Sequence, residues 1–294
     1  MTILGAGLTN LNGKDIGTDD TLTLTSGDTV YGDALNIYQQ ATGGNDTITG
    51  ADNATNNLFG DADQMYGAGV GGNDTLTGGA GATAVNNLYG DAYSMSQRAL
   101  GGDDWLTGGA NGATNTLFGD AYQMSDRTTG GNDILTGGLN APGYTDTLYG
   151  DAFTMSGTAI AGNDILTAGD GGINHLYGDA DNVSDRAICG NDTLISGTGT
   201  DYMWGDAQTI NGSKVTTGAD TFVFKPNSGA DVIEDFRQSD GDKIDVSAYG
   251  FTNLASIPSI TASGSTTLIN FGSGNVELLN FTGTLTSADF IFST

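Results

Sequence analysis

The feature that most constrains this chain is a motif that returns at nearly constant spacing. Leu or a substitute, an aromatic residue, Gly, Asp and Ala recur together, and their glycines lie 28, 30, 29, 31, 28 and 27 residues apart between Gly32 and Gly205. Each interval holds short alternating runs bounded by glycine clusters, which is a strand pattern. The period predicts stacked coils that hydrogen-bond to one another at about 4.8 Å. We therefore expect an all-β parallel solenoid with enlarged coils of about 29 residues.

Two aspartate signatures alternate along this repeat. The Gly-Asp-Ala signature supplies Asp33, Asp61, Asp91, Asp120, Asp151, Asp179 and Asp206. The Asp-x-Leu/Ile-x signature supplies Asp20, Asp46, Asp74, Asp104, Asp133, Asp164 and Asp192, with a final Phe variant at Asp220. Short carboxylates held on glycine-rich turns are ligands that hard cations such as calcium prefer. Both signatures are therefore candidate metal ligands, although the Gly-Asp-Ala aspartates could instead cap turns.

The composition is strongly acidic and poor in apolar residues. The 294 residues include 35 acidic and 8 basic side chains, and only Glu234 and Glu277 are glutamates. The formal net charge of -27 argues against nucleic acid as a partner. Such a composition is also typical of disorder, so we expect folding to depend on bound cations. Cys189 is the only cysteine, which excludes an intrachain disulfide.

The two turns of each coil differ in how much their length varies. From the Gly-Asp-Ala glycine to the next Asp-x-Leu aspartate the interval is 14 residues in six coils and 15 in the last. The other connection varies: it is 10 residues between Asp46 and Asn56 and 13 between Asp133 and Asp146. A fixed length indicates a constraint, so we place the ion sites at the fixed edge. The variable edge carries amides that can stack without charge in four coils, at Asn56, Asn86, Asn115 and Asn174, and carboxylates in the others, at Asp28, Asp146 and Asp201.

Four glycine-rich stretches carry a family resemblance. Gly43–Gly50, Gly71–Gly79, Gly101–Gly109 and Gly130–Gly138 resemble the RTX, or haemolysin-type, nonapeptide Gly-Gly-x-Gly-x-Asp-x-apolar-x. The resemblance implies a right-handed parallel β-roll in which several calcium ions bind aspartate carboxylates and glycine carbonyls of successive turns. By position, the ligands would be Asp46, Asp74, Asp104, Asp133, Asp164 and Asp192, with Asp20 and Asp220 as terminal members and Gly44, Gly72, Gly102 and Gly131 as the glycines.

This chain departs from the family in its longer coil. The family's coil is two nonapeptides, whereas here Ala-x-x-Met segments such as Ala92–Met95 are inserted on one side. The role of the Gly-Asp-Ala aspartates therefore stays open, and so does the existence of a third strand through the insert.

The chain divides into three regions. Residues 1–19 carry no repeat unit and are expected to cap the first coil, and residues 20–219 hold the repeats. Residues 220–294 resemble the C-terminal region after the β-roll in serralysin-type exported proteins, through residues 219–224, 231–236 and 242–247. That resemblance implies a β cap, a type I secretion signal, and a secreted or cell-surface protein that meets the type I secretion machinery. No signal-peptide pattern and no apolar run of membrane-spanning length is present.

Three functions are consistent with these patterns. The leading hypothesis is a secreted protein that folds on binding calcium, has no catalytic activity, and serves a structural, adhesive or matrix role. Its partners would be extracellular polysaccharide or other copies of itself. The first alternative is a carbohydrate-binding module that uses an outward aromatic ladder, which Met65, Met95 and their equivalents could instead cover. That ladder comprises Tyr31, Phe59, Tyr89, Phe118, Tyr149, Tyr177 and Trp204. The second alternative is ice binding through a row of outward threonines, although the neighbouring outward positions are not all threonine. The row comprises Thr23, Thr49, Thr77, Thr107, Thr136 and Thr167.

The remaining chemically active residues favour structural roles. Arg98, Arg127 and Arg186 recur at one coil position, and Asp126 and Asp185 adjoin the latter two, so we expect a surface ion-pair row and not an anion site. His175 has no second histidine with which to form a zinc motif, and Cys189 has no evident histidine partner. With 33 aspartates in the chain, closeness of two carboxylates identifies no catalytic pair.

Overall fold

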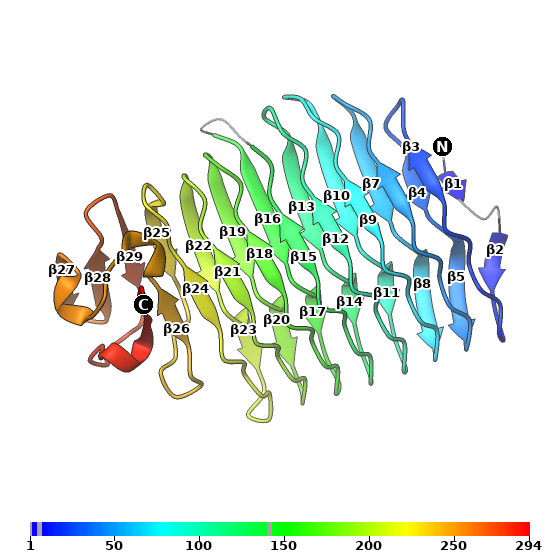
Figure 1. Ribbon diagram of the computed structural model, residues 1–294. Helices are drawn as coiled ribbons and strands as arrows, with labels where there is room; N and C mark the ends of the chain where they lie inside the picture. The colour runs from blue at the N-terminus through cyan, green and yellow to red at the C-terminus, as the bar shows by residue number, and fades with distance from the viewer. Residues whose placement is uncertain (1, 5–7, 140–142) are drawn as a thin grey trace.

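The computed structural model describes residues 2–4, 8–139 and 143–294, and Figure 1 shows them as an elongated stack of coils. Each coil of the repeat contributes one strand to each of three sheets. All strand pairs within the repeat are parallel and in register, for example Leu88 with Leu58 and Leu117. The predicted all-β solenoid is confirmed, and the open question of a third strand is answered because the Ala-x-x-Met inserts form one.

Sheet 1 contains the strands that precede the Gly-Asp-Ala turns. Its leucines, such as Leu58 and Leu88, point inward and are fully buried. In spatial order its strands are β1 (Thr2–Leu4), β4 (Thr29–Tyr31), β7 (Thr55–Phe59), β10 (Val85–Tyr89), β13 (Thr114–Phe118), β16 (Thr145–Tyr149), β19 (Ile173–Tyr177), β22 (Thr200–Trp204), β25 (Gly229–Ile233), β29 (Gly274–Leu278), β28 (Thr266–Asn270) and β27 (Ser259–Ser263).

Sheet 3 contains the strands that follow the Asp-x-Leu aspartates. It encloses the first hydrophobic core together with sheet 1, through residues such as Leu76 and Leu106. Its strands are β3 (Thr21–Thr23), β6 (Thr47–Thr49), β9 (Thr75–Thr77), β12 (Trp105–Thr107), β15 (Ile134–Thr136), β18 (Ile165–Thr167), β21 (Thr193–Ile195), β24 (Thr221–Val223), β26 (Lys243–Asp245) and β30 (Phe290–Ile291).

Sheet 2 forms an arm on the side of this core. Each of its strands turns back through a short segment that makes single β-bridges from coil to coil, such as Val70 with Leu100. A second core of alanines and methionines fills the arm, and it includes Met65, Met95 and Ala99. The strands are β2 (Leu8–Leu11), β5 (Ala34–Gln39), β8 (Ala62–Gly67), β11 (Ala92–Met95), β14 (Ala121–Met124), β17 (Ala152–Met155), β20 (Ala180–Ser184) and β23 (Ala207–Asn211).

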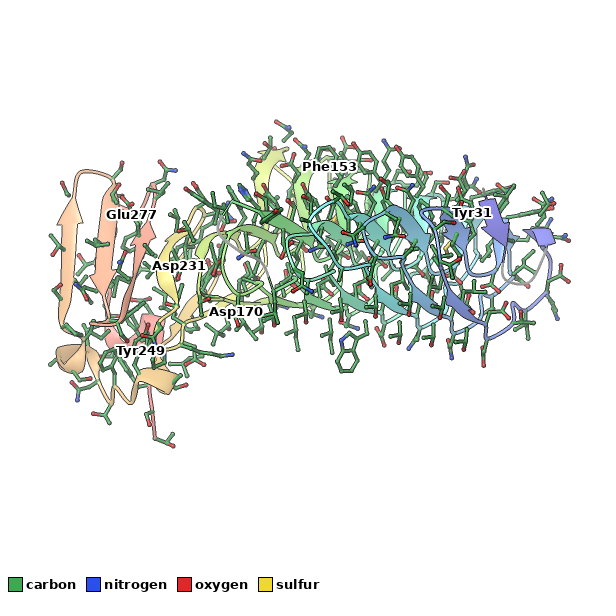
Figure 2. All side chains as sticks on the ribbon, turned by 90° about the horizontal axis from the view of Figure 1, so that it is seen from above. Tyr31, Phe153, Asp170, Asp231, Tyr249 and Glu277 are labelled. Carbon is green, nitrogen blue, oxygen red and sulfur yellow. The ribbon has the colours of Figure 1, made fainter. Side chains whose placement is uncertain are left out.

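The aromatic ladder is covered by its own stacking and by a second row, Tyr93, Tyr122 and Phe153, whose rings pack edge-on against it. Neighbouring rings stack with centroids 4.4–4.9 Å apart, as in Phe59 and Tyr89, and each ladder ring is only 3–8% exposed. The prediction that methionines cover the rings is wrong, because the Gly-Asp corner turns sheet 2 so that Met65 and Met95 face the returning chain. Figure 2 shows Tyr31 and Phe153 along the same side of the solenoid.

Both ends of the chain continue the sheets. β1 and β2 pair with β4 and β5, so the segment before residue 20 forms part of the first coil. After β23 the arm stops, and β24, β25 and β26 extend sheets 1 and 3. The antiparallel pair β28–β29 forms a hairpin near the C-terminal end, and short 3₁₀ turns occupy η1 (Ser247–Tyr249), η2 (Leu254–Ser256) and η3 (Ser287–Asp289). None of the described helices has the length and apolar character needed to cross a membrane.

Candidate metal centre

Both aspartate signatures meet in the interior, at the junction between the two cores. The Asp-x-Leu aspartates from Asp46 to Asp220 and the Gly-Asp-Ala aspartates from Asp33 to Asp206 are each at most 2% exposed. Asp20, in the first coil, is half-buried. We call the two ladders and the glycines between them the aspartate seam. The seam is the junction because Gly-Asp-Ala begins the arm and the Asp-x-Leu aspartate ends it.

The Asp-x-Leu aspartates link one coil to the next. The backbone N–H of Asp74 donates to Oδ1 of Asp104 at 2.7 Å, and the N–H of Asp104 donates to Oδ1 of Asp133 at 2.7 Å. The same bond recurs from Asp20 to Asp192 with lengths between 2.6 and 2.9 Å. This ladder leaves the second carboxylate oxygen of each residue free for another partner.

The Gly-Asp-Ala aspartates close the arm within one coil. Asp91 accepts the backbone N–H of Gly102 at 3.0 Å, and Asp120 accepts that of Gly131 at 2.9 Å. In the six coils from Asp33 to Asp179, the accepting aspartate lies 11 residues before the donating glycine. In the last coil, Asp206 lies 12 residues before its donor. The fixed interval of 14 residues, with 15 in the last coil, contains the segment that this bond closes, and both lengthen by one residue in the last coil.

Glycines let the two ladders approach each other. A Cβ atom added to Gly60 would lie 1.9 Å from Oδ2 of Asp74 on the other side of the seam. A Cβ on Gly72 would lie 1.6 Å from the carbonyl oxygen of Gly44 in the preceding coil. Gly102 and Gly131 stack in the same way, on the carbonyls of Gly72 and Gly102. The four glycines expected as ligands therefore line the seam, and their N–H groups donate to Asp33, Asp61, Asp91 and Asp120.

Many carboxylate oxygens in the seam have no hydrogen-bond donor. Among the described residues, Oδ2 is fully buried and accepts no hydrogen bond in ten aspartates: Asp46, Asp74, Asp91, Asp104, Asp120, Asp133, Asp151, Asp164, Asp179 and Asp192. A buried polar atom without a partner is costly, and a buried charge far more so. The list includes members of both signatures, so the Gly-Asp-Ala aspartates are more than turn caps.

The asparagine ladder at the variable edge provides an internal comparison. Nδ2 of Asn86 donates to Oδ1 of Asn115 at 2.8 Å, and Asn56 donates to Asn86 at the same distance. Each amide also binds the backbone of its own coil, as Asn86 does through the N–H and carbonyl of Gly79. The predicted amide ladder is confirmed from Asn56 to Asn115, and it continues through buried aspartates, which accept from Asn115 at Asp146 and from Asn174 at Asp201. The amides of this ladder have hydrogen-bond partners, whereas ten aspartates of the seam each have one oxygen without a donor.

Charge accumulation is the second unusual property of the seam. Burial raises the pKa of Asp61, Asp74, Asp91 and Asp133 well above the ordinary range, and repulsion from neighbouring aspartates raises it further. Two carboxylates about 5 Å apart repel by roughly 1 kcal/mol in water and roughly 3 kcal/mol at an effective dielectric of 20. The seam can therefore be stable only if its carboxylates are protonated or neutralised by cations.

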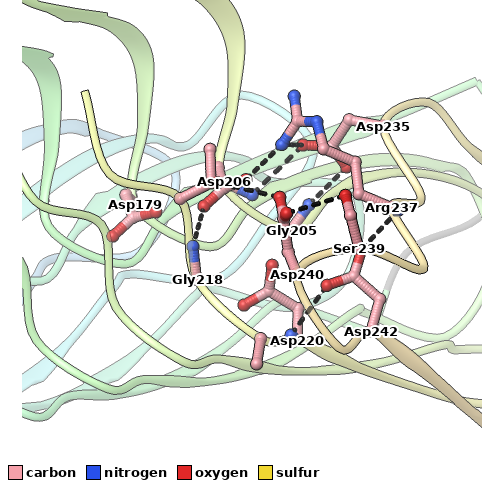
Figure 3. Close-up of polar contacts among 12 residues, drawn as sticks. Asp179, Gly205, Asp206, Gly218, Asp220, Asp235, Arg237, Ser239, Asp240 and Asp242 are labelled. Carbon is pink, nitrogen blue, oxygen red and sulfur yellow. Dashed lines mark hydrogen bonds and ion pairs between the residues drawn. The ribbon is translucent and has the colours of Figure 1, made fainter. Parts of the chain in front are cut away.

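Figure 3 shows how the seam ends at its C-terminal side. Asp235 accepts the N–H groups of Gly205 and Asp206, and Asp242 accepts the N–H of Asp220 at 3.1 Å, so both continue the ladders. The guanidinium of Arg237 forms an ion pair with Asp206 and lies 3.8 Å from Asp235. The chain thus supplies its own cation at this end. Sequence reasoning missed Arg237, and the only signal was a lone arginine in an acidic segment.

Cys189 and His175, the two remaining residues singled out in the sequence, both lie in packed surroundings. Cys189 stands where other coils have glycine, and its buried thiol lies between Asp179 and Asp206, which raises its pKa out of the reactive range. His175 stacks on Tyr202 with ring centroids 5.2 Å apart, and burial lowers its pKa. Both therefore act as packing groups. Comparison with known proteins adds no assignment, because no family model and no curated protein matches the chain.

Proposed function

We propose that this protein is a calcium-binding β-solenoid whose fold depends on cations held in the aspartate seam. The observation that carries the proposal is the contrast between two buried ladders of the same coils. The asparagine ladder is fully hydrogen-bonded, while ten aspartates of the seam have a buried oxygen without a donor. A cation placed among these oxygens would satisfy them and offset the repulsion between the coils.

The chemistry of the seam favours calcium over other metals. Its donors are carboxylate oxygens and glycine backbone groups, with no histidine and one thiol at Cys189. Hard cations select such oxygen sites, whereas zinc and copper prefer nitrogen and sulfur. Magnesium keeps several waters, and a seam packed between two cores leaves little place for them. Calcium tolerates irregular oxygen sites and fits this environment best.

A protein of this kind would be suited to folding after export. Calcium sites of extracellular modules have dissociation constants of about 0.1–1 mM, so the chain would stay open in a calcium-poor cell interior and close outside it. The C-terminal resemblance to type I secreted proteins supports the same order of events. A secreted structural, adhesive or matrix role without a catalytic step follows from this proposal.

The experiment is a calcium titration of the chelated protein followed by circular dichroism. We expect a weakly structured spectrum in excess chelator and a cooperative gain of β-structure as calcium is added. Magnesium at the same concentrations is the control and should produce little change. A β-rich spectrum in chelator that calcium leaves unchanged would refute the proposal.

The two alternative functions have weaker structural support. A carbohydrate platform needs exposed ring faces, whereas the ladder rings stack face to face and expose 3–8% of their surface. The exposed side of sheet 3 carries paired threonines on β3, β6 and β9, but Trp105, 56% exposed, interrupts them in the next coil. Thermal hysteresis of the folded protein would test the ice-binding alternative.

A further inference from the structure

The basic residues of the repeat lie in a single row. Between residues 20 and 219 the chain has four lysines and arginines, and all are exposed: Arg98, Arg127, Arg186 and Lys214. They occupy the turns that follow β11, β14, β20 and β23, along the lower edge of the arm in Figure 1. Random placement in a chain of this acidity would not gather every cation of the repeat at one edge.

A groove runs along this row. It has a volume of about 850 Å³, and all four cations line it together with Gln97 and Thr158. Two exposed carboxylates, Asp126 and Asp185, also line it, so cations outnumber acidic groups there by four to two. From the coil of Arg98 to that of Lys214 there are four coil steps, which at about 4.8 Å each make a row of roughly 19 Å. The groove is therefore long enough for several units of a chain molecule.

Among the described residues, the arginines of the row form no ion pair, although two aspartates line the groove with them. We expected an ion-pair row, but no ion pair joins Arg98, Arg127 or Arg186 to an acidic group within the described ranges. The neighbouring aspartates are engaged elsewhere. Asp126 accepts the backbone N–H of Gln97 at 3.1 Å, and Asp185 accepts that of Gly157 at 3.0 Å.

Leaving these cations unpaired has an energetic cost. Arg98 and Arg127 are exposed in adjacent coils, so their like charges repel. The chain has 33 aspartates, yet among the described residues none forms an ion pair with these arginines. An external anion would remove the repulsion.

We propose that the groove binds a linear polysaccharide that carries carboxylate groups. Guanidinium groups bind carboxylates through two parallel hydrogen bonds, and their repetition at coil spacing suits a polymer. Gln97 and Thr158 offer hydrogen bonds to hydroxyl groups between the charges. The groove lining contains no aromatic side chain on which bases could stack, so single-stranded nucleic acid fits it less well.

The test measures binding of the calcium-folded full chain to hyaluronate, with dextran of similar length as the neutral control. The wild type should bind hyaluronate and not dextran, and binding should weaken as salt is added. The variant Arg127→Gln/Arg186→Gln should lose affinity at least about tenfold, because each change removes a charge-assisted contact. The variant Lys225→Gln/Lys243→Gln removes the same charge outside the groove and should change affinity less than about twofold.

Three results would overturn the proposal. The first is no binding of hyaluronate by the wild type, and the second is an equal loss in both double variants, which would indicate only overall charge. The third is stronger binding of an oligothymidylate than of hyaluronate, which would identify nucleic acid as the occupant. Circular dichroism of every sample in calcium confirms that it is folded, so failure here leaves the calcium proposal intact.

Discussion

At the scale of the residue, the protein uses two nearly isosteric side chains for opposite purposes. Asn86 donates and accepts hydrogen bonds in its ladder, so it stabilises the stack by itself. Asp104 can only accept, and after binding the N–H of Asp74 it retains an oxygen without a donor. Under the calcium proposal, this difference in hydrogen-bond donors is why the seam would need a cation and the asparagine ladder would not.

The first prediction compares these two positions. Asp104→Asn keeps the acceptor for Asp74 but removes a charge from the seam, so we expect calcium affinity to fall about tenfold. Asn115→Ala removes buried hydrogen bonds and should cost about 1–3 kcal/mol of unfolding free energy. It should leave the number of calcium ions unchanged. Isothermal titration calorimetry measures both, and equal losses of calcium binding would contradict the assignment.

The second prediction concerns Arg237. Arg237→Gln leaves Asp206, which is 2% exposed, without its cation. Because the arginine is itself one-third exposed, we expect a moderate loss of about 1–3 kcal/mol in unfolding free energy. Lys225→Gln is the control, since Lys225 is exposed and makes no ion pair among the described residues. Denaturant unfolding in calcium that affects both variants alike would show that Arg237 does not terminate the seam.

At the scale of the element, each ladder titrates as a unit. Burial raises the pKa of Asp46 to about 7 and that of Asp220 to about 10. An aspartate in an unfolded chain has a pKa of about 3.9. The folded seam therefore holds more protons than the unfolded chain. The stability due to these protons is fully present below about pH 4 and is lost as the pH rises through the folded-state values.

The third prediction follows from this loss of stability with rising pH. In excess chelator, the protein should fold near pH 4, where the seam is protonated, and its melting temperature should fall until the folded state is lost as the pH is raised toward about 8. With saturating calcium the trend should reverse, because acid protonates the ligands and releases the ions. Scanning calorimetry across this range measures both. A chelated protein whose melting temperature rises with pH would show that the seam does not control stability.

The elements also show what the sequence could predict. Period, strand pattern and the asparagine ladder follow from residues that repeat, because each coil copies its neighbour. The convergence of Asp61 and Asp74 on one seam could not be read from spacing alone, since it depends on the arm closing over its own core of alanines and methionines. Arg237 was missed because it lies outside the repeated pattern, 31 residues after its partner Asp206.

At the scale of the whole molecule, the charge is divided between interior and edge. Much of the formal charge of -27 lies on buried aspartates of the seam, while the cations of the repeat form one exposed row on the arm. Each coil contacts only its neighbours, so cations bound in one coil favour folding of the next. The seam would govern whether the solenoid folds. The basic row would determine which ligand the folded solenoid binds.

The position of calcium in the folded protein tests the central claim most directly. Anomalous diffraction from crystals grown in calcium would locate the ions. We expect peaks bound by carboxylates of both ladders in successive coils between Asp46 and Asp192, and none along the ladder from Asn56 to Asn174. A seam without ions, or calcium bound only to exposed aspartates such as Asp103, would contradict the account.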